Sequence, residues 1–286
     1  MFEQLLIPVD GSGQSKRAAA VGLAVAERYD AHVDVLYVIE EPSERREMRS
    51  DEATAAGEAA LETVAEMADG IDASVDTHLE EGRPHRKIID NAKRNDTDLV
   101  VMGRQGRSNI QKRLLGSVTD RVLRRVSSPV LVVPGGGAET AADVALDDIL
   151  LTTDGSEAAE RADTYGRTVA EQFGATVHVL SVVDVETEAG VFDAGGVTEE
   201  FLDRLESESE DAVDRLLGQL GGNIDTRSAV IRGRPEETID EYVTDHDIDL
   251  LIMASTGKSK LKGQYLGSVT DYALRTVSVP VLVVTP

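Results

Sequence analysis

Residues 98–134 read DLVVMGRQGRSNIQKRLLGSVTDRVLRRVSSPVLVVP, and residues 249–285 read DLLIMASTGKSKLKGQYLGSVTDYALRTVSVPVLVVT. The second stretch repeats the order of apolar runs in the first and shares its GSVTD segment. A repeat of this length identifies the repeating unit before any structural assumption is made. We therefore expect two copies of one domain in the 286 residues, in keeping with a usual domain size of roughly 100–200 residues.

The start of the repeat sets the domain boundaries. LLIPVDGS at residues 5–12 returns as ILLTTDGS at residues 149–156, which is 144 residues later, whereas the final segments lie 151 residues apart. The second copy therefore has seven additional residues, which we expect after its second strand. We assign residues 1–136 and 147–286 to the two domains, and the glycine-containing, polar stretch 137–146 to a flexible linker.

The pattern within each copy predicts an α/β fold. Short β-branched runs alternate with helical stretches, which is typical of parallel strands joined by crossover helices. The runs VLYVI, LVVM and VLVV are apolar on both faces, as expected for strands covered by helices on each side. We expect two tandem, doubly wound, Rossmann-like domains, each with a five-stranded parallel sheet. The expected strands of the first copy are 4–9, 32–39, 74–80, 99–103 and 130–133, and its expected helices are 14–29, 52–69, 84–95 and 118–126. In the second copy, we expect a solvated amphipathic helix at residues 199–214.

The composition is that of a folded and strongly acidic protein. Hydrophobic residues make up 41% of the chain, and 53 Asp and Glu stand against 29 Lys and Arg, which gives a formal net charge of −24. Such a charge repels a phosphate backbone, so nucleic acid is not an expected partner. Only 7 of the basic residues are Lys, and this acidic, Lys-poor composition resembles that of halophilic archaeal proteins, whose self-repulsion is screened by molar salt.

Several site classes are excluded or disfavoured by residue content. The chain has no Cys, which rules out disulfides and thiolate metal sites. No apolar run approaches the roughly 18 residues that a membrane span requires, so we expect no membrane association and a cytoplasmic location. The five His form no i, i+3 or i, i+4 pair, so no zinc site is expected. We also find no catalytic triad or comparable set of residues with a local signature.

The loop after the fourth expected strand is the clearest candidate for ligand binding. Gly103 and Gly106 follow this strand, and Gly116 and Ser117 come at the start of the next expected helix. Glycine lets a backbone approach an anion closely, and a helix start presents N–H groups at its positive end, so this pattern favours a phosphate ligand. Ser117 and Asp120 also fit a capping box, which is the alternative explanation for the serine.

This loop and the segment IPVDGS together resemble the universal stress protein family. GRQG, nine residues and GS match the pattern G-x2-G-x9-G-[S/T] of the family's nucleotide-binding members, and the resemblance covers both halves of the chain. The resemblance implies that ATP lies across the carboxyl ends of the parallel strands, where open α/β sheets commonly bind ligands. It is compatible with Mg²⁺ or Mn²⁺ on the phosphates, although no dedicated protein cage for a cation is evident.

The resemblance also assigns roles to individual residues of the first copy. Asp10 would accept hydrogen bonds from the ribose hydroxyls, and Val38 would pack on adenine. The other implied site residues are Pro8, Val9, Met102 and Gly103 around the base and ribose, and Arg104, Gly106, Arg107, Gly116, Ser117 and Val118 around the phosphates. Taken alone, Asp10 fits an Asp-Gly-Ser turn, Val38 fits the core, and the two arginines fit a solvated loop.

The second copy carries a partly degenerate version of this site. Its matching residues are Asp154, Val182, Gly257, Gly267, Ser268 and Val269. Ala254 replaces Gly103, and Thr152 replaces Pro8. If Gly103 has a left-handed backbone, alanine there costs about 1–2 kcal/mol and weakens the second site. If its dihedral angles are ordinary, alanine is harmless in this respect.

These observations lead to one main functional hypothesis and two alternatives. The main hypothesis is an ATP-binding, regulatory universal stress protein in which the nucleotide favours one conformation or surface and so controls an unidentified protein partner. The alternatives are a slow ATPase or phosphotransferase that uses the same site, and an interaction module without nucleotide. The apolar final strands of both copies predict that the two halves pair as an intramolecular pseudo-dimer, with further homodimerisation left open.

Overall fold

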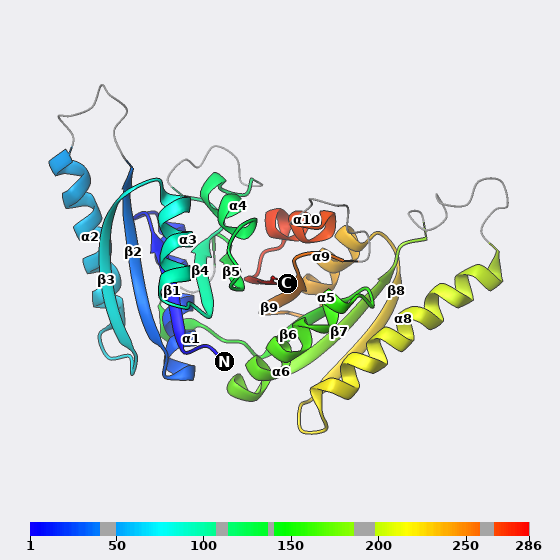
Figure 1. The fold of residues 1–286 in the computed structure, drawn as a ribbon. Coiled ribbons are helices and arrows are strands. Elements are labelled where there is room, and N and C mark those ends of the chain that lie inside the picture. The colour runs from blue at the N-terminus through cyan, green and yellow to red at the C-terminus, as the bar shows by residue number, and fades with distance from the viewer. Residues whose placement is uncertain (41–49, 107–113, 137–139, 186–197, 258–265, 286) are drawn as a thin grey trace. The chain divides into compact units, whose positions relative to one another are not determined.

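The computed structural model describes residues 1–40, 50–106, 114–136, 140–185, 198–257 and 266–285. The chain forms two compact units, Met1–Ala145 and Leu146–Val284, so their boundary lies within the expected linker. Each unit is an α/β domain built around parallel strands, as the repeat predicts (Figure 1). Among the described residues, no helix is long and apolar enough to cross a membrane.

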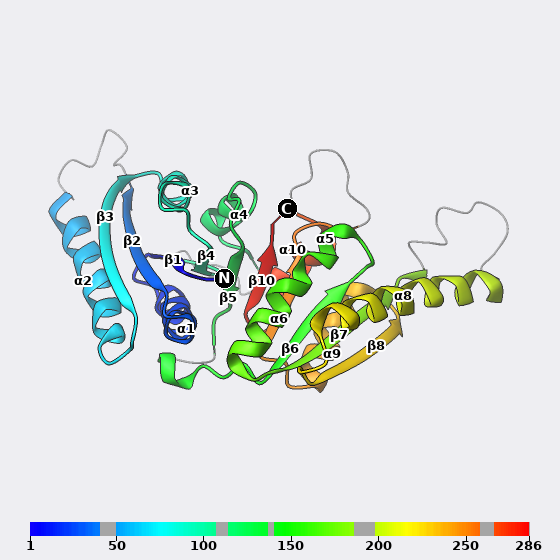
Figure 2. The same cartoon turned by 60° about the horizontal axis from the view of Figure 1, so that its bottom comes forward.

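The first unit contains a parallel sheet whose strand order is β3-β2-β1-β4-β5. Helices α1 and α2 pack on one face of this sheet, and α3 and α4 lie on the other (Figure 2). All five residues of β4 are buried, as expected for a strand covered on both faces. The strands are β1 Gln4–Val9, β2 His32–Glu40, β3 Ser74–Gly82, β4 Leu99–Gly103 and β5 Val130–Val133; the helices are α1 Gly13–Tyr29, α2 Ser50–Ala68, α3 Pro84–Arg94 and α4 Ser117–Leu123.

The second unit repeats this topology with the strand order β10-β9-β6-β7-β8. Its first helical segment differs, because α5 and α6 meet at Arg161 where the first unit has the single helix α1. The strands are β6 Asp148–Thr153, β7 Thr176–Val183, β8 Thr226–Arg232, β9 Leu250–Ala254 and β10 Val281–Val284; the helices are α5 Glu157–Glu160, α6 Ala162–Phe173, α8 Glu199–Leu220, α9 Pro235–Asp245 and α10 Ser268–Thr276.

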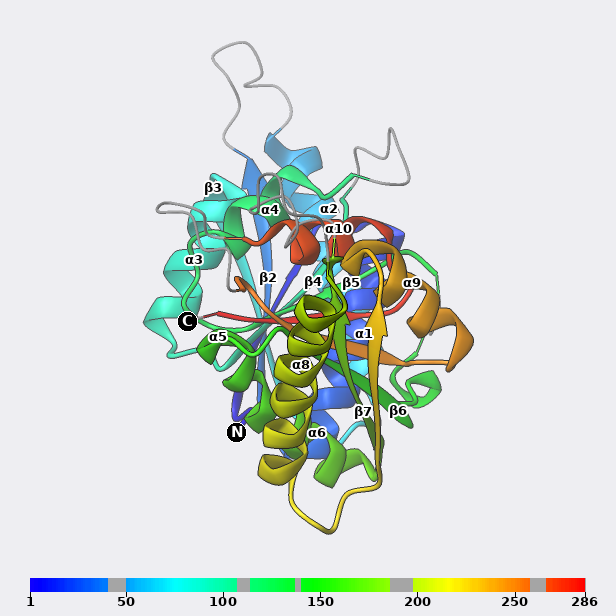
Figure 3. The same ribbon diagram turned by 90° about the vertical axis from the view of Figure 1, so that its right-hand side faces the viewer.

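The additional residues of the second copy lie between β7 and β8, as predicted. Helix α8 has 22 residues, against 19 in α2, and packs along β7 and β8 (Figure 3). It is the predicted amphipathic helix, extended to Leu220, and its buried residues Ala212, Val213, Leu216 and Leu220 lie in its C-terminal half.

Candidate functional site

The candidate site of the first unit forms where β1 and β4 end and α1 and α4 begin. Asp10 follows β1, Gly103 is the last residue of β4, and Gly116 precedes α4. Because β1 and β4 are neighbouring parallel strands, their carboxyl ends lie at the same edge of the sheet. The structure therefore brings the two separate sequence motifs together.

The Asp-Gly-Ser segment forms a tight turn that also starts α1. Gly11 has a φ of 78°, a left-handed conformation that suits glycine. The Oδ1 atom of Asp10 accepts a hydrogen bond from Ser12 N at 3.0 Å, and Ser12 caps α1 by accepting from Ser15 N at 3.2 Å. The turn interpretation of Asp10 is therefore correct, and this hydrogen bond uses the Oδ1 atom of the carboxylate.

The second carboxylate oxygen of Asp10, Oδ2, lies against Gly106. A Cβ atom placed on Gly106 would lie 2.3 Å from it, so any larger residue would displace the carboxylate. The second unit reproduces the arrangement, with Oδ2 of Asp154 at 2.3 Å from a Cβ atom placed on Gly257. The close approach explains why glycine follows the fourth strand at this position in both copies.

The start of α4 differs from the sequence prediction. Gly116, and not Ser117, is the N-cap residue, and it makes no side-chain cap, so the predicted capping box is wrong. Asp120 instead binds the side chain of Arg124, with Oδ1 at 3.0 Å from Nε. Ser117 is exposed at the first position of the helix, which places its hydroxyl at the surface of the site.

Gly116 holds the loop together through its main chain. Its N–H group donates to the carbonyl oxygen of Arg104 at 2.8 Å, so this amide is already used within the protein. The expectation that the Gly116 amide itself holds phosphate therefore does not fit this structure. The following amides, those of Ser117 and Val118, belong to the first turn of α4, where N–H groups have no intrahelical partner.

Two supporting side chains were not predicted from the sequence. Thr119 Oγ1 donates to Gly103 O at 3.0 Å and ties α4 to the end of β4. Its counterpart Thr270 donates to Ala254 O at 2.9 Å, so the shared GSVTD segment contained the signal for this contact. Gln14 Oε1 accepts from Gln105 N at 3.0 Å, but the equivalent residue of the second unit is Ala158, so the repeat gave no signal for this contact.

The apolar site residues fall into two groups. Pro8, Val9 and Met102 are buried, so they offer a ligand little exposed surface. Val38 is half-buried in the otherwise mostly buried strand β2, and Val182 repeats this in β7. The two valines therefore offer apolar surface near the carboxyl end of each second strand, where the resemblance implies contact with adenine. Val118 and Val269 are also half-buried.

Arg104 is 7% exposed, so its alternative interpretation as a solvated loop arginine is wrong. Arg107 lies outside the described residues.

The second unit keeps the backbone plan of the site but changes its side chains. Gly103 does not have a positive φ, so the expected backbone strain of Ala254 is wrong and the ordinary-dihedral alternative holds. A larger difference lies in the next two positions, where Ser255 and Thr256 replace Arg104 and Gln105. Ser255 is 1% exposed and Thr256 is 5% exposed, and within the described part of the chain their hydroxyls have no hydrogen-bond partner.

Comparison with known proteins gives the same result for both units. The profile described as the universal stress protein family matches residues 1–134 and again residues 146–285. A universal stress protein of Mycolicibacterium smegmatis is 27% identical over 99% of this chain and 97% of its own length, and one of Methanocaldococcus jannaschii is 34% identical over 46% of this chain and 82% of its own length.

A solved structure shows the same two-domain fold. The crystal structure of a universal stress protein from Archaeoglobus fulgidus superposes with a TM-score of 0.72 and 23% sequence identity. The match covers 99% of this chain and 97% of that protein. At this level of identity the likeness concerns the fold alone.

Proposed function

This chain belongs to the universal stress protein family, with one family domain in each unit, and from that premise we propose that its first unit binds ATP at the carboxyl ends of β1 and β4. The bound nucleotide acts as a regulatory ligand. It favours one conformation or surface of the unit, and through it controls an interaction with a protein partner. The protein acts in the cytoplasm.

The observation that carries the proposal is the contact between Asp10 and Gly106. The Oδ2 atom of Asp10 lies so close to Gly106 that a Cβ atom added to this glycine would be 2.3 Å from it. Both residues are half-buried, so this edge of the sheet is partly open to solvent. A carboxylate is a strong acceptor for the two hydroxyls of a ribose, and the loop backbone offers N–H donors to phosphate oxygens.

The neighbouring residues fit the other parts of a nucleotide. Ser117 is exposed at the start of α4, so its hydroxyl and the first-turn amides can donate to phosphate. Val38 supplies apolar surface for the base. Mg²⁺ or Mn²⁺ would reduce the charge of the triphosphate, which otherwise has to approach a chain with a net charge of −24.

The second unit would bind nucleotide more weakly. Asp154, Gly257 and Ser268 remain, but the loop lacks the support that Gln14 gives to Gln105 in the first unit. Its buried hydroxyls on Ser255 and Thr256 replace an arginine and a glutamine. A less supported loop has to be ordered on binding, and that ordering costs affinity.

Pairing of the two halves through their final strands stays part of the proposal. Its test is the oligomeric state of the first half expressed alone.

A serine substitution tests the proposed phosphate contact. Ser117→Ala removes an exposed hydroxyl that does not cap the helix, so the fold should be unaffected. If the hydroxyl binds phosphate, its loss removes a hydrogen bond to a charged group, about 1.5–3 kcal/mol, and weakens ATP binding roughly 10- to 150-fold. Ser268→Ala makes the same change in the second unit. Calorimetry at molar KCl should show the larger loss for Ser117→Ala, and unchanged ATP affinity in this variant would contradict the phosphate assignment.

A further inference from the structure

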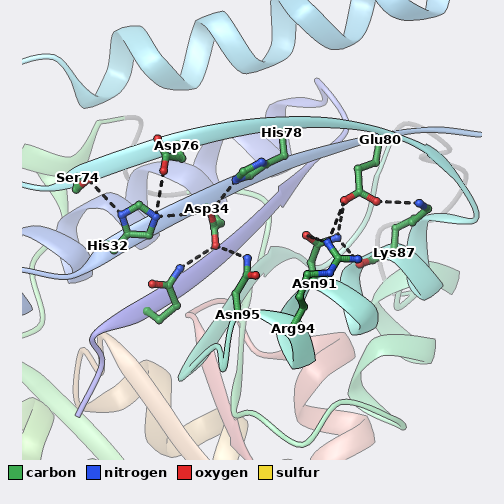
Figure 4. A network of polar contacts seen from close by, with 11 residues as sticks. His32, Asp34, Ser74, Asp76, His78, Glu80, Lys87, Asn91, Arg94 and Asn95 are labelled. Carbon is green, nitrogen blue, oxygen red and sulfur yellow. Dashed lines mark hydrogen bonds and ion pairs between the residues drawn. The ribbon is translucent and has the colours of Figure 1, made fainter.

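A second polar cluster lies on β2 and β3, near the starts of these strands and away from the nucleotide site. His32 and Asp34 are two residues apart on β2, and Asp76 and His78 are two residues apart on β3. Residues at this spacing share one face of a strand. The register pairs Asp34 with Asp76, so all four side chains lie on the same face of the sheet (Figure 4).

Three of these side chains have the spacing of metal ligands. His32 Nε2 lies 3.6 Å from Asp34 Oδ1 and 3.5 Å from Asp76 Oδ2, and one ligand atom from each of the three residues can be chosen so that all lie within 4.8 Å of one another. These distances exceed those of ordinary N–H···O hydrogen bonds, about 2.7–3.2 Å. With bonds of about 2.0–2.2 Å to a tetrahedral ion, neighbouring ligand atoms lie roughly 3.3–3.6 Å apart.

The ligand atoms are oriented by further hydrogen bonds. Asp34 Oδ2 accepts from Gln4 Nε2 and from Asn95 Nδ2, each at 2.8 Å, and Asp34 Oδ1 lies 2.7 Å from His78 Nε2. His32 Nδ1 lies 3.2 Å from Ser74 Oγ, which turns Nε2 toward the two carboxylates (Figure 4). Metal-binding imidazoles and carboxylates in proteins are commonly held by such second contacts.

The cluster has a buried side and an open side. The side chain of Asp34 is 6% exposed, whereas that of Asp76 is 68% exposed, so an ion can reach the buried ligand from solvent.

The second unit shows that the fold does not require this cluster. His178 occupies the position of Asp34, and Arg227 that of Asp76. His178 is fully buried and binds Asp148 Oδ1 at 2.9 Å and the hydroxyl of Tyr242 at 3.1 Å. Both ring nitrogens thus have protein partners at hydrogen-bond distance, unlike Nε2 of His32, which lies between two carboxylates at a longer distance.

We propose that His32, Asp34 and Asp76 bind one divalent transition-metal ion of the zinc type, with His78 holding Asp34 in place and water completing the coordination. One imidazole with two carboxylates suits zinc and similar ions better than Mg²⁺ or Ca²⁺, which prefer oxygen ligands alone. The ion joins β2 to β3 and so stabilises the first unit. The helical spacings that argued against a zinc site do not apply, because these ligands lie on strands.

The test uses the full chain, stripped of metal and nucleotide, at molar KCl. Titration with Co²⁺ should show one saturable site per chain, with visible absorption of tetrahedral or five-coordinate cobalt that Zn²⁺ abolishes by displacement. Asp76→Asn and His32→Gln should each lower the Co²⁺ affinity at least about tenfold. Their matched controls Asp72→Asn, an exposed aspartate near the start of β3, and His85→Gln, outside the cluster, should bind as the parent does.

These measurements distinguish metal binding at the cluster from weak metal binding by scattered surface carboxylates and from metal binding at the nucleotide site. Binding that is unchanged in both cluster variants, an octahedral cobalt spectrum, or no saturable binding up to millimolar Co²⁺ would each overturn the proposal. Thermal melts establish that the variants fold, and Zn²⁺ should raise the melting temperature of the parent but not that of Asp76→Asn. Asp10→Asn should retain the metal site even if the proposed ATP binding fails.

Discussion

Gly106→Ala should weaken ATP binding to the first unit while leaving the fold intact. Among the described residues, the atoms of other side chains within 4 Å of a Cβ placed on Gly106 are Oδ2 and Cγ of Asp10, at 2.3 and 3.4 Å. Gly106 does not have a positive φ, so alanine meets no backbone strain there. The collision is therefore relieved by rotating the carboxylate of Asp10, at a cost to stability of about 0.5–1.5 kcal/mol.

The rotation removes Asp10 from the position in which it would accept from the ribose. A hydrogen bond to a charged group contributes about 1.5–3 kcal/mol, so we expect the ATP affinity to fall roughly 10- to 150-fold. Gly13→Ala is the matched control, because a Cβ placed on Gly13, the first residue of α1, has no neighbour within 4 Å in the part of the chain that the structure describes. It should leave the affinity unchanged and can stabilise α1 by up to about 1 kcal/mol.

Isothermal titration calorimetry with Mg²⁺ and ATP at molar KCl measures the affinities, and thermal melts of the same samples report the fold. Gly257→Ala produces the same collision with Asp154 in the second unit, also at 2.3 Å, and so separates the two sites. Unchanged ATP affinity in folded Gly106→Ala would refute the role of Asp10. An equal loss in Gly13→Ala would show that the effect comes from α1 and not from the carboxylate.

Three further predictions concern pH, salt and the association of the two halves. Burial lowers the pKa of His178, and this effect outweighs the hydrogen bond to Asp148, which raises it. Below the ordinary histidine pKa of about 6.5, the unfolded chain therefore binds more protons than the folded chain. The free energy of unfolding should fall from pH 7.5 to 5.5 by up to about 1.4 kcal/mol per pH unit. The pKa of the more exposed His85 is also lowered, so this residue adds a smaller pH dependence of the same sign to the free energy of unfolding. Denaturant melts that do not change between pH 7.5 and 5.5 would contradict this role of His178. Residues 1–140 carry a net charge of −6 and residues 141–286 one of −18, so KCl should raise the melting temperature, chiefly through the second half; a melting temperature that ignores salt would refute this. Residues 1–136 expressed alone should form homodimers in sedimentation experiments, because their final strand lacks its proposed partner; a stable, strictly monomeric half would count against pairing of the two halves.

Most bounds of the strands and helices of the first unit could be predicted from the sequence to within two residues. The strands β1, β4 and β5 have the predicted bounds, because each is a short apolar run that ends at a turn residue or a polar segment. Helix α4 ends at Leu123, three residues before its predicted end. There the backbone tightens, with Arg125 N donating to Val122 O at 2.9 Å, while the apolar pattern continues to Val126 and so gave no sign of the helix end.

The site was less predictable, because it depends on conformations that residue types do not specify. The Ser-x-x-Asp pattern is the same whether Ser117 is the N-cap residue or the first residue of the helix, and only the structure shows that Gly116 is the N-cap and that Asp120 binds Arg124. The dihedral angles of Gly103 were equally open from the sequence. The cluster around Asp34 was missed because its ligands come from two strands, and their register determines which of them meet.

A crystal structure of the full chain with Mg²⁺ and ATP, grown at molar KCl from protein that calorimetry shows to be saturated, tests the central claim most directly. We predict ATP in the first unit, with a ribose hydroxyl within hydrogen-bond distance of Asp10, the base against Val38 and a phosphate at Ser117. Nucleotide bound away from the ends of β1 and β4, with this edge of the sheet occupied by solvent alone, would contradict the account.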